Sequence, residues 1–255
     1  MQCEGPLVDR FGRVHDNLRL SVTDRCNLRC FYCMPEEAVQ FRQRSEILQF
    51  EEIERFVRIS VALGVRRLRI TGGEPLVRAG LPALVRQLAA IPGVADLAMT
   101  TNGLLLAEHA APLRAAGLQR LNISLDSLRE TTFRRIARRD GLARVLAGID
   151  AAVQAGFDKI RLNTVAIRGI TESEVIALAE YALAHAMELR FIEFMPLDAD
   201  SNWHSQYVLP GAVIRAQLEQ RFGPLVPVTR EDRSQPAVDY ALADSGGRIG
   251  FINPV

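Results

Sequence analysis

Three cysteines stand close together in the sequence, Cys26, Cys30 and Cys33, in the spacing CxxxCxxC. Thiolates this close can each bind one iron of a 4Fe-4S cube, which leaves the fourth iron without a protein ligand. An iron with an open position can bind a small molecule. A structural zinc site would need a fourth ligand, and the neighbouring sequence offers neither a second CxxC pair nor a suitably spaced histidine. The cysteine segment therefore predicts an iron-sulfur cluster with one open iron.

The composition of the chain favours a small partner. Its 255 residues include 31 Lys and Arg against 30 Asp and Glu, a balance that argues against a nucleic-acid or anionic membrane surface. No stretch has the apolar length needed to span a bilayer, and the first residues lack the apolar core of a signal peptide. We therefore expect a cytoplasmic protein without a disulfide among the three clustered cysteines, and we interpret Cys3 as an incidental thiol.

The elements that must position the cysteines alternate between short β-like runs and amphipathic helical runs, which is typical of parallel βα units. Strands are expected at residues 17–24, 65–71, 96–102, 120–127, 159–166 and 188–196, and helices at 50–63, 81–90, 105–116, 142–155 and 171–186. Several helices should end at a glycine in the left-handed conformation, namely Gly64, Gly117 and Gly156. The pattern predicts an α/β fold, an incomplete (β/α)6 TIM-like barrel over residues 1–200, with a short α+β flank over residues 201–255. The alternative is a doubly wound sheet whose strand-end arginines are solvated.

Within the expected strands, polar and apolar residues alternate. The polar face would gather Arg19, Arg69, Ala98, Thr100, Asn102, Asn122, Ser124, Asp126, Arg161, Asn163, Glu193 and Met195. If the apolar faces pack under the helices, this polar face lines the lumen, which implies a ligand. Buried guanidinium groups are costly unless paired, so Arg19, Arg69 and Arg161 together predict a bound anion.

A second motif follows the cysteines after one βα unit, in the run TGGEP over residues 71–75. Glycines at the carboxyl end of a strand let a ligand approach the backbone closely. The combination of CxxxCxxC and GGE resembles radical S-adenosylmethionine enzymes. In these, the open iron holds the methionine part of the cofactor, and one electron releases a 5′-deoxyadenosyl radical. The resemblance thus implies a 4Fe-4S cluster and S-adenosylmethionine as cofactors.

The runs NLRLSVTDRCNLRCFYCMP, RITGGEPL, TTNG, NISLDS and RFIEFMPLD further resemble the GTP 3′,8-cyclase family of molybdenum-cofactor biosynthesis, over essentially the whole chain. The resemblance implies that S-adenosylmethionine contacts Tyr32, Gly73, Ser124 and Met195. GTP would contact Arg19, Arg69, Thr100 and Arg161, where Arg161 stands in place of a family lysine. Arg is bulkier than Lys and forks its donors. No side chain is assigned as a catalytic acid or base.

The family continues past a GRIGFI-like segment into three more cysteines that hold a second 4Fe-4S cluster, whereas this sequence stops at Val255. We therefore expect a truncated chain with impaired turnover. The resemblance also implies an electron donor, a homodimer and the next enzyme of the pathway as partners. Two alternatives stay open: another radical enzyme, such as a peptide maturase, and a non-catalytic iron-sulfur binding module.

Overall fold

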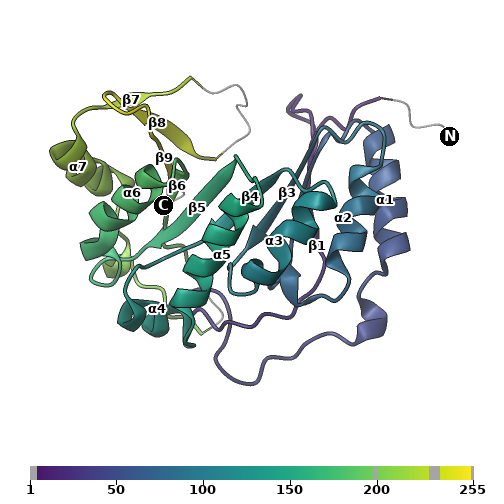
Figure 1. Ribbon diagram of the computed structural model, residues 1–255, viewed down its shortest axis with the longest axis horizontal. Helices are drawn as coiled ribbons and strands as arrows, with labels where there is room; N and C mark the ends of the chain where they lie inside the picture. The colour runs from purple at the N-terminus through teal and green to yellow at the C-terminus, as the bar shows by residue number, and fades with distance from the viewer. Residues whose placement is uncertain (1–4, 198–199, 230–235, 254–255) are drawn as a thin grey trace. The chain divides into compact units, whose positions relative to one another are not determined.

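The computed structural model describes residues 5–197, 200–229 and 236–253, and it divides into two compact units (Figure 1). The first unit holds residues 5–27, 40–122 and 144–159. The second holds residues 28–39, 123–143 and the described residues from 160 onward. Cys3 lies outside the described residues.

The first unit is built on a parallel sheet with the strand order β1-β2-β3-β4. Its strands are β1 (Asn17–Ser21), β2 (Arg67–Thr71), β3 (Asp96–Thr101) and β4 (Arg120–Ser124). The last two residues of β4 belong to the second unit. The registers align Leu20 with Ile70 and Ile70 with Met99, and all three side chains are buried. The other face of β1 and β2 carries the charged residues. The alternation predicted from the sequence is therefore present in this unit.

The helices of the first unit are α1 (Phe50–Ala62), α2 (Leu81–Ala89), α3 (Leu106–Ala115) and most of α5 (Leu142–Gln154), with short 3-10 turns η1 (Arg44–Glu46) and η2 (Pro75–Val77). A capping box starts α1, because Glu52 accepts from the backbone N–H of Gln49 at 2.7 Å while the Gln49 side chain caps the Glu52 N–H. The glycines predicted to end helices take positive φ: 96° at Gly64, 103° at Gly117 and 80° at Gly156.

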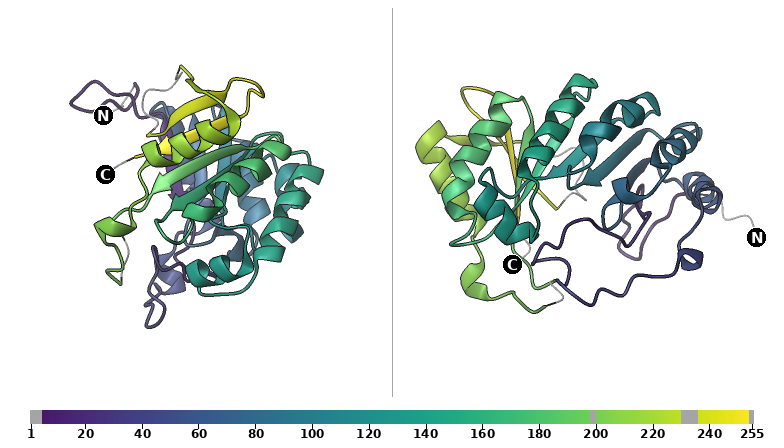
Figure 2. Two further views of the ribbon diagram at one scale, coloured as in Figure 1. Left: turned by 90° about the vertical axis from the view of Figure 1, so that its left-hand side faces the viewer. Right: turned by 60° about the horizontal axis from the view of Figure 1, so that its bottom comes forward.

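In the second unit the strand order is β5-β6-β9-β8-β7. Its strands are β5 (Ile160–Ala166), β6 (Glu188–Glu193), β7 (Leu225–Pro227), β8 (Val238–Leu242) and β9 (Arg248–Ile252). Its helical elements are α4 (Glu130–Ala137), η3 (Glu172–Glu174), α6 (Val175–Ala184), η4 (Ser205–Tyr207) and α7 (Gly211–Phe222). β5, β6 and β9 are parallel, and β8 and β7 add in antiparallel pairs. Figure 2 shows this yellow hairpin beside α7. The segment expected to be an appended flank thus extends the sheet through β9.

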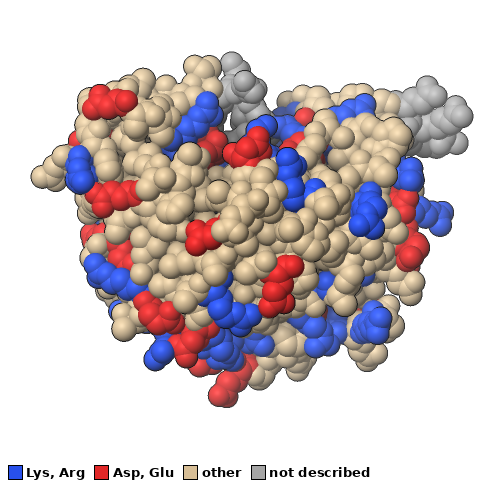
Figure 3. Space-filling view, viewed as in Figure 1, with Lys and Arg blue, Asp and Glu red and all other residues tan. Residues whose placement is uncertain are grey.

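Two surface properties bear on the expected partners. No helix within the described residues is long and apolar enough to cross a membrane. On the face drawn in Figure 3, basic and acidic side chains are interspersed rather than gathered by sign. That distribution agrees with the expectation of a small partner, which the even charge balance of the sequence supports.

Candidate active site

Cys30 and Cys33 lie on one tight turn of the second unit. The backbone N–H of Cys33 donates to the carbonyl oxygen of Cys30 at 2.9 Å. Two other N–H groups of this segment donate to the carbonyls of the last two residues of α4, at 3.0 and 3.1 Å. The backbone that carries both thiols is therefore held by α4. Cys26, Cys30 and Cys33 are all free of disulfide bonds.

Cys26 follows β1 in the first unit and receives a hydrogen bond from Asn102, the residue directly after β3. The Asn102 Nδ2 donates to the Cys26 sulfur at 3.8 Å and to Oδ1 of Asn27 at 2.8 Å. Hydrogen bonds to ligand sulfurs are one of the means by which proteins set the reduction potential of an iron-sulfur cluster. In the sequence, the alternation of the third expected strand puts Asn102 on the polar face and the residue belongs to the run TTNG, but no contact with Cys26 was predicted.

The two glycines of the GGE turn pack against the backbone that leads to Cys26. The Gly73 N–H donates to the carbonyl of Thr23 at 2.7 Å, and the next N–H along donates to the carbonyl of Arg25 at 2.8 Å. A Cβ on Gly73 would lie 2.4 Å from the Arg25 carbonyl oxygen, and one on Gly72 would lie 2.6 Å from that of Thr23. Within this unit, the missing side chains of the two glycines therefore allow the backbone of residues 23–25 to pack closely against the GGE turn.

Glu74 links this turn to the end of β3. Its carboxylate is buried, with 1% of the residue exposed, and it accepts three hydrogen bonds. These come from the Leu76 N–H (3.0 Å), the Thr101 hydroxyl (2.7 Å) and the Asn102 N–H (2.7 Å). Burial raises the pKa of Glu74, while the three donors oppose that shift. Glu74 therefore positions Asn102, which in turn reaches Cys26.

Tyr32 is anchored by a buried carboxylate of the second unit. Its hydroxyl donates to Oδ2 of Asp126 at 2.7 Å, and the other oxygen of Asp126 accepts from the Val165 N–H at 2.8 Å. Burial is the main cause that raises the pKa of Asp126 to about 6 and the pKa of Tyr32 well above its usual value. The parity of β4 predicted a polar position at Asp126. The bond to Tyr32, 94 residues away, left no signal in the sequence.

Two arginines of the predicted substrate set face each other in the first unit. The register pairs Arg19 of β1 with Arg69 of β2, and Arg69 with Ala98 of β3. Thr100, two residues beyond Ala98, therefore lies on the same face as both arginines. Like charges directly opposite each other in neighbouring strands repel, so this face favours an anion. Arg67, at the alternate position of β2 on this face, pairs with Asp16 at 2.7 Å.

The second unit corrects one prediction about the polar face. Arg161 of β5 lies opposite Glu188 of β6, and the next polar pair is Asn163 with Arg190. Glu193 was predicted to share this face and does not, because it lies opposite Ala166. There its buried carboxylate accepts from the Gly211 N–H at 2.9 Å, at the start of α7. The sequence thus assigned Glu193 to the wrong face of β6, because its carboxylate accepts a hydrogen bond from the first residue of α7.

Arg190 of β6 shares the face of Arg161 and lies opposite Asn163. No role was predicted for Arg190 from the sequence. Desolvation lowers the pKa of Arg190, and the nearby Arg161 lowers it further. Each guanidinium has a carboxylate partner: Arg161 bonds to Glu188, with its Nε at 2.8 Å, and Arg190 bonds to Asp239 at 3.2 Å. The neighbouring strands β5 and β6 therefore carry two arginines, each paired with a carboxylate.

The remaining predicted contacts lie at strand ends. Ser124 is the last residue of β4 and is half-buried, and Met195 is two residues past the end of β6. Within residues 5–197, 200–229 and 236–253, no three His, Cys, Asp or Glu side chains are gathered as a ready metal site. The donor chemistry of three thiols, one with an amide donor to its sulfur, nevertheless fits an iron-sulfur cluster. The assignment of ligands to Cys26, Cys30 and Cys33 stays a prediction.

Family models divide the chain into two matched regions. Residues 20–182 match the Radical SAM superfamily, and residues 187–255 match the family described as Molybdenum Cofactor Synthesis C. A GTP 3′,8-cyclase of Rhodopirellula baltica is 56% identical over 252 residues, which cover 98% of this chain and 70% of the relative. One from Geobacter sulfurreducens is 47% identical, covering 98% of this chain and 76% of the relative.

The chain belongs to the GTP 3′,8-cyclase family of radical SAM enzymes. The predicted α/β fold of the radical SAM type is confirmed. Streptococcus suis SuiB bound to S-adenosylmethionine matches with a TM-score of 0.65 and 18% identity, over 81% of this chain and 48% of that one. Methylornithine synthase matches with a TM-score of 0.63 and 16% identity, over 81% of this chain and 62% of that one. A radical SAM family member is expected to use a 4Fe-4S cluster and S-adenosylmethionine.

Proposed function

We propose that the chain converts GTP to (8S)-3′,8-cyclo-7,8-dihydroguanosine 5′-triphosphate in molybdenum-cofactor biosynthesis. Relatives at 56% and 47% identity carry the name GTP 3′,8-cyclase, and the second family description refers to molybdenum-cofactor synthesis. The structural observation that carries the proposal is the direct opposition of Arg19 and Arg69, on the same face as Thr100. Two cations held side by side in a sheet suit a triphosphate.

The cofactors would be held by the residues that the family resemblance assigns to them. Cys26, Cys30 and Cys33 would bind the 4Fe-4S cluster. The S-adenosylmethionine contacts would be Tyr32, Gly73, Ser124 and Met195. When bound, these groups would supply radical abstraction of the 3′ hydrogen of GTP, and one electron and one proton from an external donor would complete the bond between C3′ and C8 of guanine. The anchoring of Tyr32 by Asp126 supports its role, because it fixes the backbone on which an adenine would lie.

GTP would contact Arg19, Arg69, Thr100 and Arg161. Arg161 already bonds to Glu188, with its Nε at 2.8 Å, but a guanidinium carries five N–H donors and can serve a second anion. The neighbouring Arg190 adds positive charge on the same face. The lysine that the family has at this position would offer one compact charge, whereas Arg161 can bridge a carboxylate and a phosphate.

From the family resemblance we also infer three further partners: an external electron donor, a second copy of the chain in a homodimer, and the next enzyme of the pathway. The same resemblance implies a cytoplasmic location. A second 4Fe-4S cluster would belong to the part of the relatives that the chain does not match, since the match covers 70% of the Rhodopirellula protein.

The experiment is a comparison of GTP binding by reconstituted wild-type protein, Arg69→Ala and Arg58→Ala. Arg58 is the matched control, because it is an exposed arginine of α1 whose partner among the described residues is Glu54 in the same helix. We expect Arg69→Ala to weaken GTP binding by about 1.5 to 3 kcal/mol, the value of a lost charge-assisted hydrogen bond. Guanosine, which lacks the phosphates, should bind both variants equally.

Iron content and 5′-deoxyadenosine release are measured in parallel to show that the cluster is intact. Equal GTP affinity of the two variants, with the cluster intact, would contradict the substrate assignment. Binding of a cluster without any cofactor cleavage would instead support a non-catalytic iron-sulfur module, and modification of a peptide would support a maturase.

A further inference from the structure

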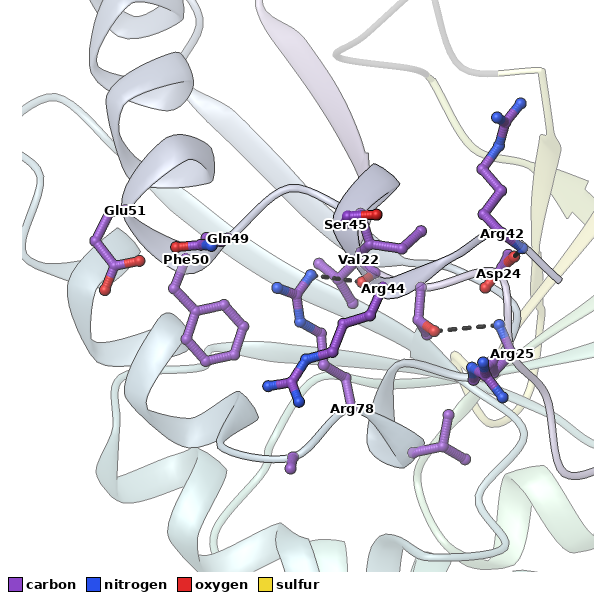
Figure 4. Close-up of a pocket in the computed structure, with 14 residues that line it drawn as sticks. Val22, Asp24, Arg25, Arg42, Arg44, Ser45, Gln49, Phe50, Glu51 and Arg78 are labelled. Carbon is purple, nitrogen blue, oxygen red and sulfur yellow. Dashed lines mark hydrogen bonds between the residues drawn. The ribbon is translucent and has the colours of Figure 1, made fainter.

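A second basic site lies in the first unit, in a pocket of about 920 Å³ between the end of β1, η1, the start of α1 and η2 (Figure 4). Its lining includes four arginines, Arg25, Arg42, Arg44 and Arg78, against two carboxylates, Asp24 and Glu51. The lining therefore has an excess of two positive charges. None of these residues belongs to the substrate set proposed above.

Arg78 is fixed at the floor of this pocket. Its Nη1 donates to the carbonyl of Val22 and its Nη2 to that of Leu48, both at 2.6 Å. The guanidinium carbon lies 4.5 Å from the centre of the Phe50 ring, at the start of α1. These contacts use two of its five N–H donors and fix the plane of the group, so its remaining donors have a defined direction.

Arg44 extends beside Arg78 without a carboxylate partner. Figure 4 shows the two side chains running next to each other along the pocket. In the described part of the chain, Arg44 forms no salt bridge, although Arg42 pairs with Glu46 at 3.2 Å. Partial burial lowers the pKa of Arg78, and the charge of Arg44 lowers it further, so the two cations are close enough to repel. An anion between them would remove that repulsion.

The acidic residues of the lining do not supply that anion. Oδ2 of Asp24 accepts from the backbone N–H of Arg42 at 2.6 Å. Glu51 is an exposed residue in the first turn of α1, where its charge complements the helix dipole. In Figure 4 the Glu51 side chain lies beyond Phe50, away from Arg44 and Arg78.

We propose that this pocket is a binding site for a small phosphate-bearing anion, held between Arg44 and Arg78. Planar guanidinium groups match the geometry of phosphate oxygens. Small-molecule sites usually have volumes of about 300 to 1,000 Å³, so the pocket can hold a pyrophosphate or a nucleotide. The site shares no residue with the proposed GTP contacts and can be tested whether or not the proposed reaction is correct.

The test is a calorimetric titration of reconstituted protein with inorganic pyrophosphate, for wild type, Arg44→Gln and Arg58→Gln. Arg44 is substituted rather than Arg78, because Arg44 has an exposed side chain whereas Arg78 ties two backbone segments together. Thermal unfolding of each variant checks that the fold is kept. Each titration is repeated in an Arg69→Gln background, so that pyrophosphate at the proposed GTP site cannot mask the pocket.

We expect Arg44→Gln to weaken pyrophosphate binding at least about tenfold, and Arg58→Gln to leave it unchanged. In the Arg69→Gln background, the loss caused by Arg44→Gln should persist. Equal pyrophosphate affinity of Arg44→Gln and Arg58→Gln in both backgrounds would overturn the proposal. A GTP titration identifies the source of the phosphate: unchanged GTP affinity in Arg44→Gln supports a separate ligand, and a parallel loss supports the substrate's own phosphates.

Discussion

Substitution of Glu74 by Gln tests how the GGE turn is connected to the cysteine segment. Oε1 of Glu74 accepts from the Leu76 N–H and the Thr101 hydroxyl, and Oε2 accepts from the Asn102 N–H. A glutamine that keeps the first two bonds turns its NH2 group toward the Asn102 N–H, so two donors oppose each other. One charge-assisted bond is lost and a partly buried N–H loses its partner. We expect a loss of about 1.5 to 3 kcal/mol in the free energy of unfolding.

The assay is anaerobic urea unfolding of wild type, Glu74→Gln and Glu52→Gln. Glu52 is the matched control, because glutamine can also close the capping box of α1, so the change should cost less than about 0.5 kcal/mol. Since Asn102 would lose its anchor, the 5′-deoxyadenosine yield should fall in Glu74→Gln while iron content is kept. Equal stability of the two variants would refute the role given to Glu74.

Three further predictions follow from the same contacts. Because the folded protein binds the Asp126 proton more tightly than the unfolded chain, with a pKa of about 6 instead of 3.8, wild-type stability should fall by about 3 kcal/mol as pH rises through this interval. Asp126→Asn should lack that fall in urea titrations, and an identical pH profile would refute it. Asn102→Leu removes a donor to the Cys26 sulfur, so the reduction potential of the cluster should become more negative at unchanged iron content; an unaltered potential would count against the contact. Cys30→Ser should abolish iron loading, whereas Cys3→Ser should not, and full loading of Cys30→Ser would remove this cysteine from the ligand set.

The alternation of polar and apolar residues was predictable in strands that bury one face under helices and leave the other face polar. In β1 and β2, Leu and Ile alternate with Arg and Thr, and the observed register puts Arg19 beside Arg69 as that alternation requires. Such strands keep one face under helices, so the period of two is written into the sequence. The helix-ending glycines were predictable for the same reason, because they depend on nearby backbone alone.

The face of Glu193 was not predictable, because its role depends on contact with a residue 18 positions later. Alternation within β6 pointed to a polar lumen residue, yet the carboxylate caps the first turn of α7 and is buried there. The bonds from Asn102 to Cys26 and from Tyr32 to Asp126 span 76 and 94 residues. Contacts of that kind arise when the fold brings segments together, and the sequence pattern records only that a polar residue is present.

The same limit applies to the pocket around Arg44 and Arg78. In the sequence, these two arginines stand 34 positions apart in runs that look like ordinary solvated loops. Only the fold shows that Arg78 is fixed by two carbonyls and that Arg44 lies next to it. The charge excess of the pocket is local, since the whole chain is nearly neutral.

The most direct test of the proposed reaction follows the hydrogen at the 3′ position of GTP. The reconstituted protein is reduced anaerobically with S-adenosylmethionine and GTP that carries deuterium at C3′, and the 5′-deoxyadenosine is analysed by mass spectrometry. We predict one deuterium in the 5′-deoxyadenosine, together with a cyclised nucleotide that keeps its triphosphate. Unlabelled 5′-deoxyadenosine, released with GTP unchanged, would contradict the assignment of GTP as the substrate.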